Sequence, residues 1–152
     1  FNAVESYRLN KDGTVATTFR FREGSVTGEE KIYRPTGFIE DHQSNAIWGM
    51  QFLWPIKTDY RIVFVAEDYS RTIIGRNQRD YVWIMAREPN IPDDEYDTIV
   101  EFVKSIGYDV GNLERVPQRW SGEATRIGTW AFWECPRTRI GFFTAPTTLI
   151  AP

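Results

Sequence analysis

The stretch that decides the fold is AIWGMQFLWPIKTDYRIVFVA, residues 46–66, in which bulky apolar side chains recur at every second position. Its first half places Trp48 and Met50 on one face, and its second half places Tyr60 and Ile62 on one face. Period-two alternation is typical of a β-strand that buries one side. The stretch therefore predicts two consecutive strands joined by a short turn.

The same alternation continues on both sides of this stretch, and turn residues separate the runs. Lys11-Asp12-Gly13 reads as a tight hairpin turn, and Pro35 marks a bulge or an edge within its strand. The pattern predicts seven antiparallel strands, at Ala3–Leu9, Thr14–Arg22, Glu30–Ile39, Ala46–Trp54, Tyr60–Ala66, Thr72–Gly75 and Asp80–Ala86.

One helix is predicted, at Pro92–Ile106, with proline at its first position and Gly107 as its stop. Its apolar residues recur at intervals of three and four, so one stripe of the helix must be buried. The outer wall of the sheet is the expected place for it.

Composition excludes several classes of protein and site. The 152 residues carry a net charge of -3 and no basic block, so nucleic acid is not an expected partner. Cys135 is the only cysteine and His42 the only histidine, so we expect no disulfide, no metal site, no cofactor and no serine–histidine hydrolase. No apolar run is long enough for a membrane helix, and the start at Phe1 suggests processing, trimming or rearrangement.

Consecutive antiparallel strands either stack as a sandwich or curl into a barrel. The expected inward faces mix aromatic rings with Glu5 and Thr17, and a dry sandwich core seldom tolerates such polar groups. A barrel of about eight strands has room for one small ligand. The alternative that the rings simply fill a core stays open.

Three signatures resemble those of the lipocalin family. Gly128-Thr129-Trp130 is similar to its Gly-x-Trp, Thr58-Asp59-Tyr60 to its Thr-Asp-Tyr at a strand-to-strand turn, and Arg87 to the arginine that ends its last barrel strand. The segment from Trp54 to Arg119 also resembles bacterial outer-membrane lipocalins of the Blc type. The resemblance implies an all-β, eight-stranded antiparallel up-and-down barrel with one α-helix packed on the outside.

The order of these signatures departs from the family, whose Gly-x-Trp opens the chain. We interpret this as a circular permutation, for which an engineered origin is the leading explanation. The expected division is one lipocalin domain over 1–152, with the family's strands B to H, helix and C-terminal strand in 1–120, a linker at 121–124, the displaced first strand at 125–143 and a tail at 144–152. The alternative is that the tail from Ser121 is unrelated sequence with a chance Gly-x-Trp.

The resemblance also implies structural roles. Trp130 would lie across the barrel floor under the guanidinium of Arg87, which could also donate to backbone carbonyls. Asp59 would cap a turn, and Gly128, Thr58 and Tyr60 would hold the fold with it.

The predicted function is binding and carriage of a small hydrophobic molecule inside the barrel, with fatty acids or lysophospholipids as the class that the resemblance implies, or a synthetic apolar ligand if the chain is engineered. The chain would be soluble, as a monomer or a strand-swapped dimer, whereas its native relatives would be found at the outer membrane or in the periplasm. The expected lining is Tyr7, Val15, Thr17, Phe19, Phe21, Trp48, Met50, Phe52, Ile62, Phe64, Tyr81, Trp83, Met85 and Phe132.

Two alternatives to carriage remain. If Glu134 is buried among aromatic rings, it could serve as the general base of an engineered proton-abstraction catalyst, although an exposed glutamate is the simpler reading and no enzyme is expected. The third reading is a permuted folding scaffold without ligand function.

Overall fold

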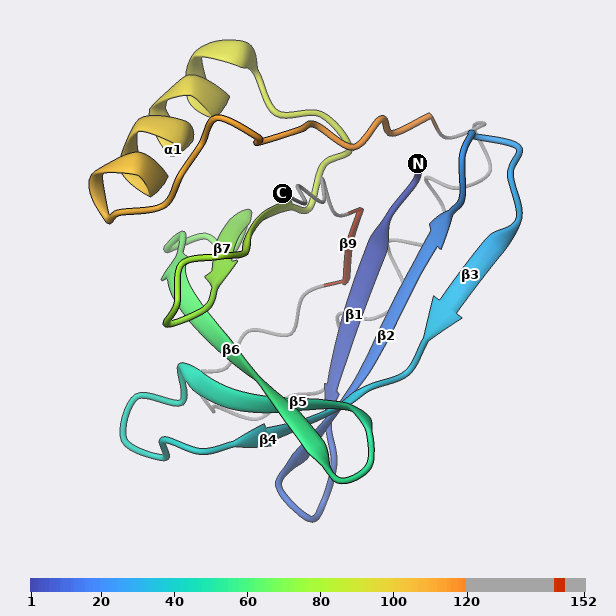
Figure 1. Cartoon of the computed structure of the whole chain (residues 1–152), viewed down its shortest axis with the longest axis vertical. Coiled ribbons are helices and arrows are strands. Elements are labelled where there is room, and N and C mark those ends of the chain that lie inside the picture. Colours follow the sequence, from blue (N-terminus) through green and yellow to red (C-terminus); the bar gives the residue numbers. More distant parts are fainter. Residues whose placement is uncertain (120–143, 147–152) are drawn as a thin grey trace.

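The computed structural model describes residues 1–119 and 144–146, which form nine strands and one helix (Figure 1). The elements are β1 (Val4–Leu9), β2 (Thr14–Arg22), β3 (Glu30–Tyr33), β4 (Thr36–Ile39), β5 (Ile47–Leu53), β6 (Ile56–Val65), β7 (Arg71–Gly75), β8 (Val82–Ala86), α1 (Asp93–Ser105) and β9 (Thr144–Pro146).

All nine strands belong to one curled antiparallel sheet in the order β8-β7-β6-β5-β4-β2-β1-β9, with β3 also paired to β2. β1 pairs with β2 in a hairpin around Lys11-Asp12-Gly13, as the sequence predicts. β9 pairs with β1 and also has Cα atoms within 8 Å of β8, so it lies between β1 and β8 (Figure 1). The predicted antiparallel all-β fold with one helix is confirmed.

β9 falls in the segment that the sequence reading assigns to the tail. The predicted displaced strand at 125–143 lies outside the described residues, as do the predicted linker at 121–124 and the Gly-x-Trp. The circular permutation and the single-domain division of 1–152 therefore stay predictions.

The predicted third strand is in fact two strands. β3 and β4 are separated by Arg34 and Pro35, and both pair with β2. Proline has no backbone N–H, so it cannot donate to the ladder and the strand breaks there. The carbonyl of Pro35 still accepts a 3.1 Å hydrogen bond from the backbone N–H of Thr17, which keeps β4 aligned with β2.

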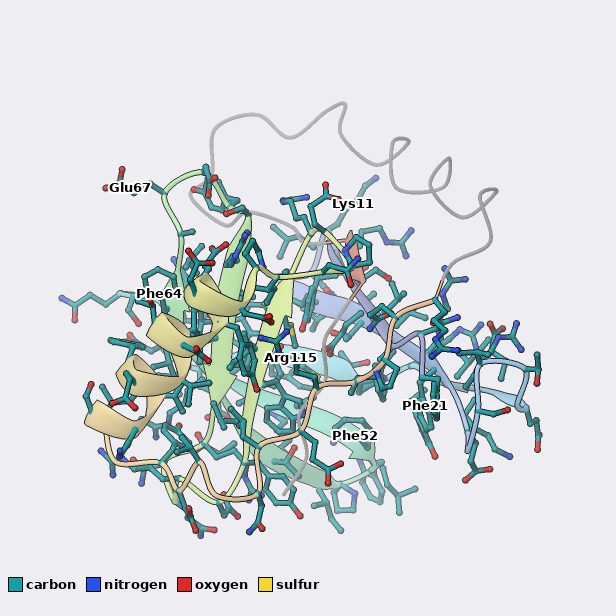
Figure 2. The ribbon with its side chains drawn as sticks, turned by 90° about the horizontal axis from the view of Figure 1, so that it is seen from above. Lys11, Phe21, Phe52, Phe64, Glu67 and Arg115 are labelled. Carbon is teal, nitrogen blue, oxygen red and sulfur yellow. The ribbon has the colours of Figure 1, made fainter. Side chains whose placement is uncertain are left out.

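A register shift in β6 changes the face on which its last residues lie. Ile62 pairs with Ile74, but Phe64 pairs with Ile73, so one extra residue is accommodated between them. The ring of Phe64 consequently lies on the outer face, with its centroid 5.9 Å from that of Phe102 in α1, and Figure 2 shows Phe64 beside this helix. The predicted inward position of Phe64 is wrong, because simple alternation fails at a bulge.

The helix packs on the outer face of the sheet, as predicted. Pro92 is its N-cap rather than its first residue, and Gly107 ends it with a φ of +94°. The outer cluster joins the helix to β7 and β8 and comprises Ile73, Val82, Ile84, Ala86, Ile91, Val103 and Tyr108, with Val63, Tyr96, Ile99, Ile106, Val110 and Leu113 packed against it.

After the helix, residues 107–119 return to the start of β1 (Figure 1). The backbone N–H of Asn2 donates to the carbonyl of Pro117 at 3.0 Å, and the Asn2 side chain exchanges hydrogen bonds with the backbone of Arg119. These bonds fix the chain beside the first strand and hold Asn2 in a left-handed conformation with a φ of +50°.

Candidate functional site

The inner face of the curled sheet carries a second apolar cluster, which is the candidate site. This inner cluster comprises Val15, Trp48, Met50, Tyr60, Ile74 and Met85, with Tyr7, Ile39, Ile62 and Trp83 packed against it. With these neighbours it contains side chains from seven strands, so it can form only when the sheet curls. Its members are at most 7% exposed except for the four half-buried neighbours.

Gly37 in β4 makes this packing possible. A Cβ atom there would lie 3.2 Å from Cε3 of Trp48 and 3.3 Å from Cβ of Val15. The indole therefore rests on the bare backbone of β4 and stacks on Tyr60, with ring centroids 5.6 Å apart. The indole N–H of Trp48 donates to the carbonyl of Asn45 at 2.8 Å, which fixes the ring.

Toward one end of the sheet, aromatic rings of the inner face become exposed. Phe19 and Phe21 follow Thr17 along β2, whereas Tyr81 and Trp83 precede Met85 at the start of β8. Because these two strands run in opposite directions, the four rings lie toward the same end. We name this set the rim rings, and it comprises Phe19, Phe21, Tyr33, Tyr81 and Trp83.

The rim rings form two stacks. On one side Phe19, Phe21 and Tyr33 stack with centroids 5.2 to 6.4 Å apart, and on the other Tyr81 stacks on Trp83 at 5.8 Å. Tyr33 is 49% exposed and Tyr81 38% exposed. Figure 2 shows Phe21 on the side of the molecule away from α1. The inner face thus has a buried floor, the inner cluster, and an accessible aromatic wall.

A polar group lies at the boundary between floor and wall. Glu5 in β1 is only 9% exposed and pairs in register with Phe19, while Tyr7 pairs with Thr17. Burial raises the pKa of the Glu5 carboxyl to about 7, and the neighbouring Tyr7 hydroxyl opposes part of that shift by favouring the carboxylate. The Tyr7 hydroxyl also makes a hydrogen bond with the hydroxyl of Tyr60.

The expected lining residues divide into four groups. Val15, Thr17, Trp48, Met50 and Met85 are buried on the inner face, and Tyr7, Ile62 and Trp83 are half-buried beside them. The rings of Phe19, Phe21 and Tyr81 lie among the accessible rim rings, whereas Phe52 is exposed and follows Met50 at a register shift of β5. Phe64 lies outside the sheet, and Phe132 and Glu134 lie outside the described residues.

The structural roles predicted from the resemblance need one correction. Thr58, Asp59 and Tyr60 lie within β6 and not at a strand-to-strand turn, so Tyr60 belongs to the inner cluster. The side chain of Asp59 pairs with Arg61 at 2.9 Å and accepts a hydrogen bond from the backbone N–H of Asn77 at 2.5 Å. Asp59 does cap a turn, but the turn is that between β7 and β8.

Arg87 contacts the turn between β6 and β7. The Nε–H of Arg87 donates to the carbonyl of Tyr69 at 2.7 Å, which confirms the predicted donation to backbone. The backbone N–H of Arg87 donates to the carbonyl of Ser70 at 3.0 Å. Glu67-Asp68-Tyr69 matches two of the three residues of Thr-Asp-Tyr and does lie at a strand-to-strand turn. The predicted stacking of Trp130 on Arg87 lies outside the described residues.

Sequence reasoning placed Glu5 and Tyr60 on inward faces, where they alternate with Tyr7 and Ile62 as period two predicts. It did not include Glu5, Tyr33 or Tyr60 in the expected ligand lining. Tyr33 was obscured by the strand break at Pro35, which hides its pairing with Phe19.

Two negative findings hold for the described part of the chain. Residues 1–119 and 144–146 contain no group of three or more His, Cys, Asp or Glu side chains placed to hold a metal ion. Within the same ranges, α1 is too short and too polar to cross a bilayer.

Known proteins resemble this chain over most of its described length. The family described as "Lipocalin-like domain" matches residues 1–118. Temperature-induced lipocalin-1 of Arabidopsis thaliana is 27% identical over 121 residues, which cover 74% of this chain and 63% of that protein. Outer membrane lipoprotein Blc of Citrobacter freundii is 24% identical over 115 residues, which cover 68% of this chain and 65% of that lipoprotein.

A curled antiparallel sheet with an outer helix and an aromatic inner face defines an up-and-down type of β-sheet protein. With residues 1–118 matched, the chain belongs to the lipocalin family. It spans less than two thirds of the length of the plant and Citrobacter relatives.

Proposed function

We propose that the chain binds a small hydrophobic molecule against the rim rings of its inner face. The observation that carries this proposal is the exposure of aromatic rings on a concave face whose floor is already filled. Phe19, Phe21 and Trp83 are half-buried, and Tyr81 is 38% exposed. A ligand there would cover apolar surface that the described residues leave accessible.

The filled floor limits the size and the position of the ligand. Tyr7, Tyr60 and Met85 meet across the inner face, so an alkyl chain would lie above them along the aromatic wall. Burial of about 300 Å² of chain at ~25 cal/mol per Å² contributes about 7 kcal/mol before the cost of association. Micromolar affinity is the expected range for a fatty acid, a lysophospholipid or a synthetic ligand of that size.

The scaffold interpretation and the carrier interpretation predict different contacts for the rim rings. In a scaffold the rings would only pack against the protein itself, and no apolar probe would bind with a defined stoichiometry. The relatives include a plant lipocalin and an outer membrane lipoprotein of Citrobacter freundii. This similarity supports testing the carrier interpretation first.

The test uses the neutral dye N-phenyl-1-naphthylamine, displaced by palmitate and by lysophosphatidylcholine. We expect one saturable site of micromolar affinity, weakened about tenfold in Trp83→Ala, because the indole provides wall area next to Tyr81. The matched control is Phe102→Ala, which removes a partly exposed ring from the outer face.

Calorimetry should confirm the Kd of both variants, because Trp83→Ala also removes a fluorophore. Absence of saturable binding of the dye and of both lipids to the folded protein would overturn the proposal. Equal losses in Trp83→Ala and Phe102→Ala would place the site elsewhere.

A further inference from the structure

The carboxyl group of Glu5 is the one ionisable acid buried on the inner face among the described residues. It lies at the level of Phe19, where the buried floor gives way to the accessible wall. No described lysine or arginine pairs with it, since the ion pairs of residues 1–119 all involve other acids. An unpaired buried carboxylate is costly, so its position requires a reason.

A second polar group, beside Glu5, has no hydrogen-bond partner. Thr17 is 2% exposed, and its hydroxyl oxygen makes no hydrogen bond within the described residues. Thr17 lies directly opposite Tyr7 and diagonally opposite Glu5 across the β1–β2 ladder. Diagonal neighbours on one face of a sheet lie about 7 Å apart, a gap that one small hydrogen-bonding group can bridge.

The remaining polar groups of this cluster are the two tyrosine hydroxyls. Tyr7 in β1 and Tyr60 in β6 share a hydrogen bond, and burial raises the pKa of both well above the ordinary value of 10.0. Both are therefore neutral at physiological pH. Of the described groups that face this point from β1, β2 and β6, only Glu5 titrates near neutrality.

We propose that Glu5 and Thr17, with the Tyr7–Tyr60 hydroxyls beside them, form the head-group subsite for a single-chain cationic amphiphile, a primary alkylammonium. This inference rests on the proposed function, because the alkyl chain of such a ligand would use the rim rings. It adds the selection of the head group to that function.

The chemistry favours a cation over an anion. An ammonium group has three donors, which match the carboxylate of Glu5, the free lone pairs of Thr17 and the tyrosine oxygens. A fatty acid would instead place a second carboxylate beside Glu5, where like charges disfavour each other.

The test compares three ligands that share one dodecyl chain, namely dodecylammonium, dodecanol and dodecanoate, by calorimetry at pH 8.5 and 5.5. At pH 8.5 we expect dodecylammonium to bind about tenfold tighter than dodecanol, and dodecanoate to bind more weakly than dodecanol. At pH 5.5 the carboxyl of Glu5 is protonated, so the advantage of dodecylammonium should disappear while dodecanol is unaffected.

Glu5→Gln should remove the preference for dodecylammonium at pH 8.5 and improve the binding of dodecanoate. The matched control is Glu88→Gln, which neutralises an exposed glutamate and should bind like the wild type. Thr17→Val, which keeps the shape of the side chain, should weaken dodecylammonium several-fold and leave dodecanol unchanged. This variant and the wild-type pH dependence test the subsite even if Glu5→Gln does not fold.

The outcomes separate the two proposals. If dodecanol binds but dodecylammonium shows no preference that depends on pH or on Glu5, the subsite is wrong and hydrophobic binding stands. If none of the three ligands binds, the proposed function itself fails. If Glu88→Gln changes the preference as much as Glu5→Gln, the effect is one of net charge and the subsite is also overturned.

Discussion

The hydroxyl groups of Tyr7 and Tyr60 meet inside the sheet, although the residues lie 53 positions apart in the sequence. β1 and β6 are separated by β2, β4 and β5 in the sheet, so the two side chains can meet only across the concave interior. The Tyr7 hydroxyl also lies 3.8 Å from the sulfur of Met85 in β8. These contacts connect β1 with β6 and β8 across the floor of the site.

Removal of either hydroxyl should destabilise the fold. Tyr60→Phe leaves the buried Tyr7 hydroxyl with the Glu5 carboxyl and the sulfur of Met85 as its remaining partners, and we expect a loss of about 1 to 2 kcal/mol in the free energy of unfolding. Tyr7→Phe should cost a similar amount. The double variant should cost less than the sum, because it removes both polar groups. Urea unfolding of the four proteins measures the coupling, and strict additivity would show that the pair does not stabilise the curl.

The buried carboxyl of Glu5 should make stability depend on pH. Its pKa is about 7 in the folded chain against an ordinary value of 4.5, so between these values the native state holds a proton that the unfolded state has released. The free energy of unfolding should therefore fall as pH rises from 4.5 to 7, by roughly 3 kcal/mol in total. The stabilisation is complete below pH 4.5 and lost above pH 7.

Urea midpoints at pH 5 and pH 8 test this linkage. Glu5→Gln should flatten the decline over this range and be more stable than the wild type at pH 8. Glu88→Gln should keep the wild-type slope, because that side chain is exposed. A wild-type midpoint that rises between pH 5 and pH 8 would contradict the raised pKa.

Local pattern predicted the elements well, because each expected strand buries one face and each turn carries turn residues. It failed at two places where a strand is irregular. The break at Pro35 divides one expected strand, and the bulge after Ile62 turns Phe64 outward. The sequence marks the first irregularity at Pro35 without showing that the strand divides there. The bulge after Ile62 arises from pairing with β7, which the residues of β6 alone do not show.

The candidate site was predicted less completely than the fold. Alternation identified Trp48, Met50 and Met85 as inward residues, and all three are buried on the inner face. It could not show that the floor is filled, because this depends on Tyr7 and Tyr60 meeting across the interior. The family resemblance likewise predicted that Arg87 donates to backbone, but it placed Thr58-Asp59-Tyr60 at a turn although these residues lie within β6.

Gly37→Ala should disturb the floor of the site. The added methyl group would press on Trp48 and Val15 at 3.2 and 3.3 Å, and neither neighbour can move freely within the inner cluster. We expect a loss of about 1 to 3 kcal/mol and a changed near-ultraviolet signal from Trp48. Gly111→Ala is the control, since its only close neighbour is a side-chain oxygen of Asp109, and it should change stability by less than about 0.5 kcal/mol. Equal effects at the two positions would show that the indole does not depend on the bare backbone of β4.

Docking of the helix should depend on Val103, which is completely buried between α1 and the outer face of the sheet. Val103→Ala leaves a cavity beside Ile73 and Ile84, so we expect a loss of about 2 kcal/mol in urea unfolding. Glu101→Ala, on the exposed side of the same helix, should stay within about 0.5 kcal/mol of the wild type. Dodecanol binding should be unchanged in both variants at temperatures where they are folded, because the helix and the rim rings lie on opposite faces of the sheet. A loss of dodecanol binding in folded Val103→Ala would mean that the outer cluster shapes the inner face.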